Sequence, residues 1–573
     1  MKPLFDYNRA LWAEADRDKM ATQSEPHTRA AAAATSNPTS NPTSNPTNET
    51  IKDTFESIVI AFILAFVFRA YVVEAFVIPT GSMAPTLLGR NVRVHCPNCG
   101  FHYKSDPNDS DLRDGSKIRP YLNKPLEAIC PMCLYPTVLD KGTRAYAGDR
   151  ILVHKYIYSL TEPQRWDVVV FKNPSQPEQN FIKRLVGLPS ESLWIIEGNI
   201  YVSPHADDES GWRIARKADR PAVQRAVWQP VYHSRYVPLQ SVLPKRRYEW
   251  KVPWIAIDDA EGHWQIEGRR SYHHASHKPG TIQFSFDRIE RSARQALHNT
   301  NWYPYNTLRT QDFNQEPIED VRLAASFQAE STGLGVTLRT TARLEHTSLD
   351  PQLKAVLGTI DASGNATLSC RGAGEIQILG TAQVGPFAAG MPRRVELRHV
   401  DQRVSLWVDG RCALEHPYEV GIDVLKDRAP LPGDHHPMIQ ITVSGTPVTL
   451  HRLELDRDLY YSSAKPGAPA TPGHGTRTKH QGLTLGEAPI RISENQFYCL
   501  GDNSPMSQDS RYWNQVNRWI EHRMIDPNSE SHGVVPRKLM MGKAFFVYFP
   551  AMLGWNEKSV PFVPNFAEMR FIN

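Results

Sequence analysis

The chain has 573 residues, of which 40% are hydrophobic and 22% are charged, and its formal net charge is +4. A chain of this length is expected to form several domains, and its apolar fraction is sufficient for folded cores. So small a net charge provides no basic stripe of the kind that nucleic-acid-binding proteins carry, so nucleic-acid partners are excluded.

The N-terminal 50 residues predict a disordered tail. They are charged, then rich in alanine, and then contain a Ser-Asn-Pro-Thr repeat over residues 36–47. A segment of this composition cannot bury enough apolar surface to offset the conformational entropy lost on ordering.

An uninterrupted apolar run, Ile58 to Phe68, follows the tail. It is shorter than the roughly 20 residues that span a bilayer, so a crossing has to recruit its neighbours. We expect a transmembrane helix at 54–73, with Arg69 near one end, where its long stem can reach the interface. A cleavable signal peptide is the alternative, but more than fifty residues before it would be atypical. Basic residues flank both ends, so charge does not settle the orientation.

A short extended segment, residues 74–79, connects the apolar run to Ser82 in the sequence Thr80–Thr86. Pro79 is suited to a strand edge and keeps the preceding residue out of the helical region. About nine residues separate Val73 from Ser82, which is at most about 30 Å of chain. A nucleophilic serine here would act close to the membrane surface, on a substrate that is itself held there.

Two Cys-x-x-Cys pairs predict a zinc ribbon over residues 96–140, because four thiolates on paired turns form a closed structural zinc site. Two disulfides are the alternative in an oxidising compartment. The four candidate ligands are Cys96, Cys99, Cys130 and Cys133. The other cysteines lack metal-ligand spacing and are expected to be buried small apolar side chains: Cys370, Cys412 and Cys499.

Lys183, in the segment Phe181–Pro189, is the candidate base for Ser82. A lysine accepts the serine proton only while neutral, and with an ordinary pKa under about 1% is neutral at pH 7–8. It must therefore be desolvated, and its apolar sequence neighbours can supply that environment if they fold around it.

Residues from about 203 to 490 form a large insertion. Alternating apolar runs predict a β-sandwich at 318–457, and its hairpin Val395–Gly410 is similar to those of concanavalin/laminin-G-like jelly rolls. Such a module could bind a wall glycan or a protein, or serve as a spacer. Residues 203–317 are expected to be a folded insertion of unknown role. Residues 462–485 are predicted to form a linker.

Four segments, in the same order along the chain, resemble the characteristic boxes of type I signal peptidase (leader peptidase), a membrane-bound Ser/Lys protease family. They are Thr80–Thr86, Gly148–Lys155, Phe181–Pro189 and Gly501–Arg511. The resemblance covers about a quarter of the chain. It implies a mainly β fold with a catalytic core built from 74–95, 145–202 and 490–560, into which the zinc ribbon and the sandwich are inserted. The family does not ordinarily have the cysteine insertion.

The resemblance also implies a role for each matching residue. Ser82 would be the nucleophile and Lys183 the general base, with the Ser82 N–H and the Thr80 hydroxyl stabilising the oxyanion. Ser507 would orient the lysine amine. The ion pair of Asp509 and Arg511 would support the site, and Asp149 would also have a structural role. The pockets for an Ala-x-Ala signal would be lined by residues that could equally be core: Phe76, Ile78, Pro79, Leu87 and Ile182. Catalysis would need no cofactor.

The implied function is removal of signal peptides from exported preproteins at the outer face of the cytoplasmic (inner) membrane. The N-terminus would lie in the cytoplasm, with a single membrane pass among the lipids and the catalytic domain outside. The alternatives are a Ser/Lys processing protease specialised for few substrates and a non-catalytic anchored binding protein.

Overall fold

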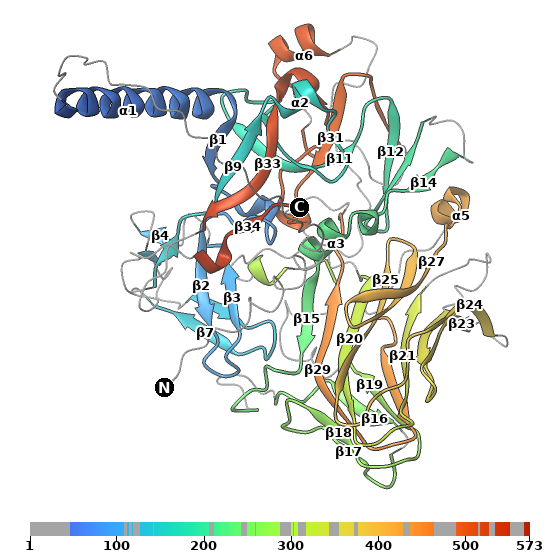
Figure 1. The fold of residues 1–573 in the computed structure, drawn as a ribbon. Helices are drawn as coiled ribbons and strands as arrows, with labels where there is room; N and C mark the ends of the chain where they lie inside the picture. Colours follow the sequence, from blue (N-terminus) through green and yellow to red (C-terminus); the bar gives the residue numbers. More distant parts are fainter. Residues whose placement is uncertain are drawn as a thin grey trace, which may run out of the picture.

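The structure is a computed structural model. Its fold is mainly β, as predicted (Figure 1). The structure describes residues 46–107, 112–113, 117–118, 126–140, 143–204, 211–241, 249–257, 259–286, 300–301, 303–306, 317–342, 354–371, 376–427, 436–462, 489–513, 516–525, 533–550 and 566–573.

An eight-stranded antiparallel sheet gathers the segments that carry the family boxes. Its central strands are rich in Val, Ile and Phe and are buried on both faces, which favours extended backbone. The strand order is β1 (Val73–Val77), β9 (Arg150–Lys155), β33 (Met540–Phe549), β10 (Val168–Lys172), β11 (Asn180–Gly187), β31 (Gln496–Leu500) and β32 (Val535–Pro536), with β34 (Arg570–Phe571) paired to β33.

A four-stranded sheet continues from it, in the order β14 (Arg213–Ile214), β13 (Asn199–Ser203), β12 (Glu191–Ile196) and β30 (Ile490–Ile492). Helix α3 (Pro221–Val227) packs its buried valines into the same apolar cluster as strands β12 and β13. This cluster also takes up Tyr303 and Tyr305 from the insertion.

Two sheets form a sandwich beside the eight-stranded sheet (Figure 1). The first runs β17 (Trp264–Gln265), β18 (Tyr272–His274), β29 (Val448–Arg457), β20 (Val321–Ala329), β25 (Pro392–Val400), β26 (Arg403–Val408) and β27 (Arg411–Pro417), with β15 (Gln229–His233) also on β29. The second runs β16 (Trp254–Ile257), β19 (Gly280–Phe284), β28 (Gln440–Ser444), β21 (Gly335–Ala342), β22 (Lys354–Ile360), β23 (Asn365–Arg371) and β24 (Ile376–Gln383).

The sandwich takes in strands that precede the predicted interval 318–457, because β15 to β19 belong to the same sheets. The hairpin within Val395–Gly410 forms as β25 and β26. Its two turn residues, Asp401 and Gln402, both have positive φ, which matches the twist of the paired strands.

The cysteine-containing segment forms small sheets next to the eight-stranded sheet: β2 (Asn91–His95), β3 (His102–Ser105) and β8 (Ala145–Tyr146) in one, β6 (Leu126–Ile129) with β7 (Pro136–Leu139), and β4 (Leu112–Arg113) with β5 (Lys117–Ile118). Cys370 and Cys499 are buried as expected, but Cys412 is exposed, so that expectation was wrong. Cys412 lies on β27, the last strand of its sheet, where one edge faces solvent.

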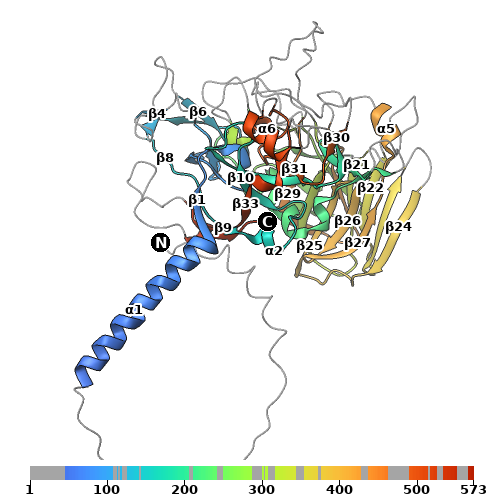
Figure 2. The same ribbon diagram turned by 90° about the horizontal axis from the view of Figure 1, so that it is seen from above.

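Helix α1 (Pro46–Tyr71) projects from the body and leads directly into β1 (Figure 2). Large apolar side chains such as Phe55, Phe62 and Phe66 are exposed on it. Among the residues described, no helix has the length and apolar character that a membrane crossing requires, so the predicted span at 54–73 is not confirmed. Of the predicted tail, residues 1–45 lie outside the described residues, as does all but the start of the predicted linker, and parts of 203–317 also lie outside them.

Candidate active site

Ser82 lies at the centre of η1 (Gly81–Met83), a single helical turn that follows β1 and Pro79. The turn is packed closely, because a Cβ added to Gly81 would lie 2.4 Å from the Tyr305 ring and 3.0 Å from an Asp106 oxygen. Only glycine fits there without displacing its neighbours. Ser82 itself is only 9% exposed.

Lys183 on β11 points its amine at this serine. Its Nζ donates a hydrogen bond to Ser82 Oγ at 2.8 Å and another to the Ile182 carbonyl at 3.1 Å. The lysine is 4% exposed, and its amine lies 5.0 Å from the centre of the Phe181 ring. Burial lowers the pKa of Lys183 to about 8, although the charge of Asp509 partly opposes the shift. The structure thus brings together the two residues that the sequence singled out, in the desolvated setting that the chemistry requires.

The segment after β31 supports the serine from the other side. Arg511 donates to both carboxylate oxygens of Asp509, at 2.8 and 2.7 Å, and Asp509 also accepts from the Gly501 N–H at 2.9 Å. A Cβ on Gly501 would lie 2.1 Å from Ser507 Oγ and 2.5 Å from the Ser82 carbonyl oxygen. The predicted pair forms, and Ser507 and Ser82 both lie beside Gly501.

Ser507 Oγ is buried and has no hydrogen-bond partner within the part of the chain that the structure describes. Its predicted contact with the Lys183 amine therefore stays a prediction. The side chain lies beside Gly501, whose position also borders the Ser82 carbonyl oxygen.

Asp149 fixes the strand ends around the turn. Its carboxylate accepts from the Leu88 N–H at 3.1 Å and from Arg570 at 2.8 Å. Its backbone carbonyl accepts from the Ile78 N–H at 2.9 Å. These contacts hold the chain on both sides of Ser82 and agree with a supporting role rather than a reacting one.

A buried ion pair that sequence reasoning missed lies beneath the dyad. Arg184, which follows the lysine, donates to both oxygens of Asp502 at 2.8 and 2.7 Å, and Thr86 Oγ1 donates to the same carboxylate at 2.5 Å. Neither charged side chain is more than 1% exposed. Its position beside Asn503 within the fourth box was the signal that the sequence offered for Asp502.

A second missed residue, Asn306, comes from the insertion and is fully buried. It exchanges two amide hydrogen bonds with Asn503, at 2.8 and 2.9 Å. Asn503 in turn donates from its side chain to the Gly81 carbonyl and from its backbone to the Ser82 carbonyl, both at 3.0 Å. Asn306 therefore braces the nucleophile turn through one intermediary, and no motif in the sequence marks it.

The predicted pocket residues divide into two groups. Ile78 and Leu87 are buried in the apolar cluster beneath the turn, and Phe76 and Ile182 are partly buried against the same cluster. Pro79 is exposed, as is Thr80, which directly precedes η1. The exposed and half-buried members are the ones that a substrate could reach.

The four paired cysteines converge as a metal site would require. Cys96 Sγ lies 3.5 Å from Cys133 Sγ, Cys99 Sγ lies 3.5 Å from Cys130 Sγ, and all four sulfurs fall within 4.8 Å of one another. A zinc tetrahedron with bonds of about 2.3 Å has sulfur–sulfur edges of about 3.8 Å. The four thiols are free, which favours a shared metal over the two disulfides.

The backbone around the cysteines repeats one pattern in both pairs. Gly100 and Leu134, each directly after the second cysteine, have positive φ and donate their N–H to the first cysteine's carbonyl. Such paired turns aim both sulfurs of a Cys-x-x-Cys at one point. The arrangement fits a structural zinc site with no open position for water.

A second cluster of possible ligands, Asp320, Asp401 and Asp458, contains its own cation. Lys217 Nζ contacts Asp401 and lies 3.0 Å from Asp458, and this amine is almost completely buried. Burial raises the pKa of Asp320 and of Asp458 to about 7. The lysine occupies the place of a metal and links the catalytic region to the sandwich.

Comparison with known proteins finds similarity to one family over parts of the chain. The family model described as Signal peptidase, peptidase S26 matches residues 142–248 and 412–549. Signal peptidase I of Aquifex aeolicus is 56% identical over 46 residues, which are 8% of this chain and 18% of that protein. Signal peptidase I of Pseudomonas aeruginosa is 41% identical over 69 residues, or 10% of this chain and 24% of that protein.

The chain thus spans a quarter or less of the length of these two relatives. Among solved structures, a carbohydrate-binding module from Bacillus subtilis aligns with 36% of this chain and 96% of its own, at 10% identity and a TM-score of 0.21. The resemblance to type I signal peptidase predicted from the four boxes is confirmed by the family and sequence matches.

Proposed function

We propose that the chain is a signal peptidase, a serine endopeptidase that removes N-terminal signal peptides from exported preproteins. The observation that carries this proposal is the 2.8 Å hydrogen bond between the buried amine of Lys183 and Ser82 Oγ. The catalytic groups need no metal, because a neutral amine can activate the hydroxyl directly.

In the proposed reaction, Lys183 Nζ takes the proton of Ser82 Oγ as the oxygen attacks the scissile carbonyl carbon. The Ser82 N–H and the Thr80 hydroxyl would stabilise the oxyanion. The ammonium then gives its proton to the leaving amine, and the acyl group stays on Ser82. Water hydrolyses this ester with Lys183 again accepting a proton, which returns to Ser82 Oγ.

The substrate would bind in extended form along β1. This strand lies at the edge of its sheet, with β9 as its partner in the sheet order, so its other edge can pair with a peptide. The strand ends five residues before Ser82, which would place the peptide's cleavage point at the turn. Phe76 and Ile182 would border the shallow pockets for small side chains.

The proposed location is the outer face of the cytoplasmic membrane, with α1 as a single-pass anchor. Its support is the exposed apolar surface of α1 and the direct connection from α1 to β1, which keeps Ser82 near that surface. Protease digestion of intact spheroplasts tests this: protection of the Ser82 side would overturn the topology.

A structural zinc ion bound by the four cysteines completes the proposal. It would hold the ribbon whose strand β2 begins nine residues after Ser82. The charge and ligand chemistry of the site suit an ion that stabilises the fold, and not one that takes part in catalysis.

Cleavage of a radiolabelled preprotein by the detergent-solubilised full chain tests the function. We expect Ser82→Ala and Lys183→Ala each to abolish cleavage without changing the melting temperature greatly. Lys172→Ala is the matched control, because this exposed lysine lies on the neighbouring strand β10 and should be dispensable. Normal cleavage by either dyad variant would refute the proposal.

A processing protease specialised for few substrates is the second candidate. The size of the sandwich favours it, because such a module could select particular preproteins. Cleavage rates across a panel of unrelated preproteins distinguish the two: similar rates indicate a general enzyme, and one strongly preferred substrate indicates a specialist.

A further inference from the structure

The loop that carries the nucleophile, residues 80–89, is closed at its neck, and we call it the nucleophile loop. A Cβ added to Gly89 would lie 2.2 Å from the carbonyl carbon of Thr80, so the two ends of the loop are in contact. The next residue, Arg90, donates its N–H to the Pro79 carbonyl at 3.4 Å. A side chain that holds both the neck and the inside of this loop would fix it as one unit.

Tyr305, in η5 (Pro304–Asn306), holds both of these places. Its hydroxyl donates to the Arg90 carbonyl at the neck, at 3.1 Å. Its ring edge lies against the inside of the loop, because a Cβ added to Gly81 would lie 2.4 Å from Tyr305 Cε1. The residue is only 5% exposed and belongs to the same apolar cluster as Leu88. The ring therefore limits where the Gly81 backbone can lie.

The backbone of Tyr305 is held in turn by the cysteine ribbon. Its carbonyl accepts from the Asp106 N–H at 2.7 Å and from Ser105 Oγ at 3.2 Å. Ser105 is the last residue of β3, which follows the first cysteine pair, and the Cys96 N–H closes that pair's turn by donating to the Phe101 carbonyl at 2.9 Å. Strand β3 thus leads from two candidate zinc ligands to the residue that packs on the nucleophile loop.

Strand β2 supplies a second connection between the same two parts. It begins at Asn91, directly after the neck, and pairs with β3 from Val92 opposite Ser105 to His95 opposite His102. The chain itself joins β2 to the nucleophile loop, and Tyr305 joins β3 to it. Both strands of the hairpin are therefore anchored, and the hairpin cannot pivot about its one covalent attachment.

We propose that Tyr305 is a positioning residue for the peptidase reaction and that it transmits the state of the cysteine ribbon to the nucleophile loop. The inference rests on the proposed function. Tyr305 would act through the backbone of Gly81, since a shift of that backbone moves Ser82 Oγ relative to the Lys183 amine. Displacements of about 1 Å at a reacting group can reduce a rate a hundredfold. A disturbed ribbon would then slow cleavage with both members of the dyad intact.

Steady-state cleavage of a preprotein by the detergent-solubilised full chain tests the positioning role. Tyr305→Ala removes the ring from Gly81, so kcat should fall about tenfold to a hundredfold while KM changes little. Tyr305→Phe keeps the ring and loses only the bond to Arg90, so it should restore most of the rate. A loss confined to KM would indicate a role in substrate binding and would contradict the proposal.

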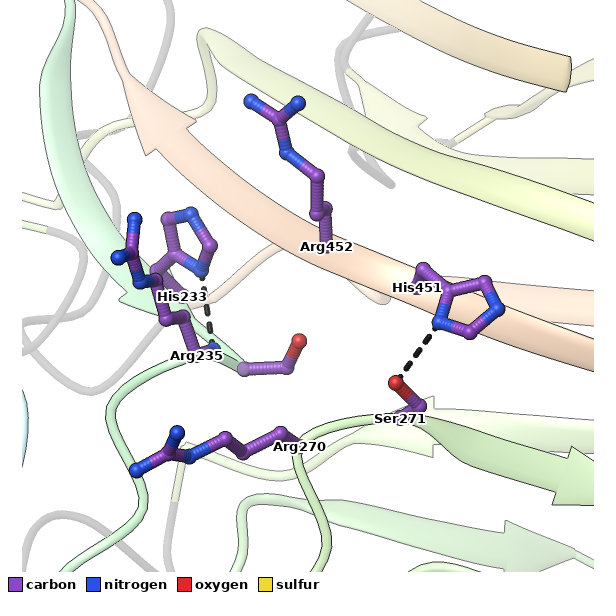
Figure 3. Close-up of a pocket in the computed structure, with 7 residues that line it drawn as sticks. His233, Arg235, Arg270, Ser271, His451 and Arg452 are labelled. Atoms are coloured by element: carbon purple, nitrogen blue, oxygen red, sulfur yellow. Dashed lines mark hydrogen bonds between the residues drawn. The ribbon is translucent and has the colours of Figure 1, made fainter. Parts of the chain in front are cut away.

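Tyr232→Ala is the matched control. This tyrosine is also buried, and its hydroxyl lies 2.6 Å from that of Tyr272, so its removal should lower the melting temperature as well. It lies in the sandwich, directly before His233 at the surface pocket drawn in Figure 3. We expect it to leave kcat unchanged, and a loss equal to that of Tyr305→Ala would show general destabilisation and overturn the proposal.

Hydrogen exchange gives a readout that does not depend on cleavage. The amides of Ala84 and Leu87 donate within the loop, to the carbonyls of Gly81 and Met83 at 3.0 and 2.9 Å. Their exchange should become about tenfold faster in Tyr305→Ala and stay unchanged in Tyr232→Ala, because only the first variant loosens this loop. Unchanged exchange in Tyr305→Ala would overturn the proposal. Normal cleavage by Ser82→Ala would instead refute the proposed function, and the exchange result would still decide the role of Tyr305.

A double-mutant cycle tests the transmission from the ribbon. Cys130→Ser disturbs the second cysteine pair and should lower kcat, and Cys133→Ser replaces it if that variant does not fold. Combined with Tyr305→Ala, the cysteine variant should add less than its own separate loss, because part of its effect passes through the missing ring. An unchanged kcat in the cysteine variant, or losses that multiply in full, would show that Tyr305 does not transmit the state of the ribbon.

Discussion

Substitution of Asn306 by alanine should slow the proposed reaction although this residue touches neither the serine nor the lysine. The change removes both amide bonds to Asn503 and leaves a donor and an acceptor of that residue unsatisfied in a fully buried place. Each such group costs about 1–3 kcal/mol, so we expect the free energy of unfolding to fall by about 2–4 kcal/mol after partial relaxation. Asn503 would then hold the Gly81 and Ser82 carbonyls less firmly.

The assay is steady-state cleavage of a preprotein over a range of concentrations. Small displacements of a nucleophile reduce rates strongly, so kcat should fall about tenfold to a hundredfold while KM changes little. Gln402→Ala is the control, because it also removes a buried amide with two hydrogen bonds, to Tyr201 and Val420, far from the dyad in the chain.

A double-mutant cycle separates positioning from general destabilisation. If Asn306 acts through Asn503, the loss of kcat in the Asn306→Ala/Asn503→Ala double variant should be no greater than in Asn503→Ala alone. An unchanged kcat in Asn306→Ala together with a lowered melting temperature, as in the control, would refute the reasoning.

Further outcomes follow from the same geometry. Cleavage measured as kcat/KM should rise about tenfold per pH unit until about pH 8 and then level off, because the base must be neutral and burial lowers the pKa of Lys183 to about 8; a rise that continues to pH 10 would show an exposed lysine. Metal analysis should find about one zinc per chain, and Cys130→Ser should lose it and melt at lower temperature; full zinc content in that variant would exclude the four-thiol site. Arg184→Met should lower the free energy of unfolding by about 3–5 kcal/mol in denaturant titrations, because it leaves Asp502 buried without its partner, and an unchanged midpoint would contradict this. Lys217→Met should lower the free energy of unfolding by the same amount, about 3–5 kcal/mol, because it leaves Asp401 and Asp458 without this cation. Arg403→Met is its control, because the Arg403 side chain is partly exposed.

The pairing of Ser82 with Lys183 was predicted from the four ordered segments that resemble the family's boxes, and the local patterns around the two residues only supported it. Ser82 follows a short strand and a proline, and Lys183 has apolar neighbours that place it in a buried strand. The convergence of the two cysteine pairs was likewise predicted, because their spacing is the geometric requirement of a four-thiolate site, and the zinc ion itself stays a prediction. The hairpin at Asp401 and Gln402 was predicted from alternation and turn chemistry.

Contacts between distant segments could not be predicted in the same way. Asn306 lies 197 positions from Asn503, and a single asparagine in a segment of mixed composition carries no local signal. The Arg184 and Asp502 pair is separated by 318 positions, and each residue looks like an ordinary surface charge until burial is known. The full extent of the sandwich was missed for the same reason, because β15 to β19 are short and find their partners far along the chain.

The insertions therefore contribute contacts to the candidate active site. Asn306 reaches Asn503, and Tyr305 packs against Gly81. Ser462, which follows the last sandwich strand, accepts from Arg511 at 2.5 Å and donates its N–H to Ser504 at 2.7 Å. Removal of 318–457 would expose Lys217 and break the strand that leads to Ser462. Deletion of the sandwich would therefore also disturb the candidate site, and single substitutions on the sandwich surface are needed to test the sandwich alone.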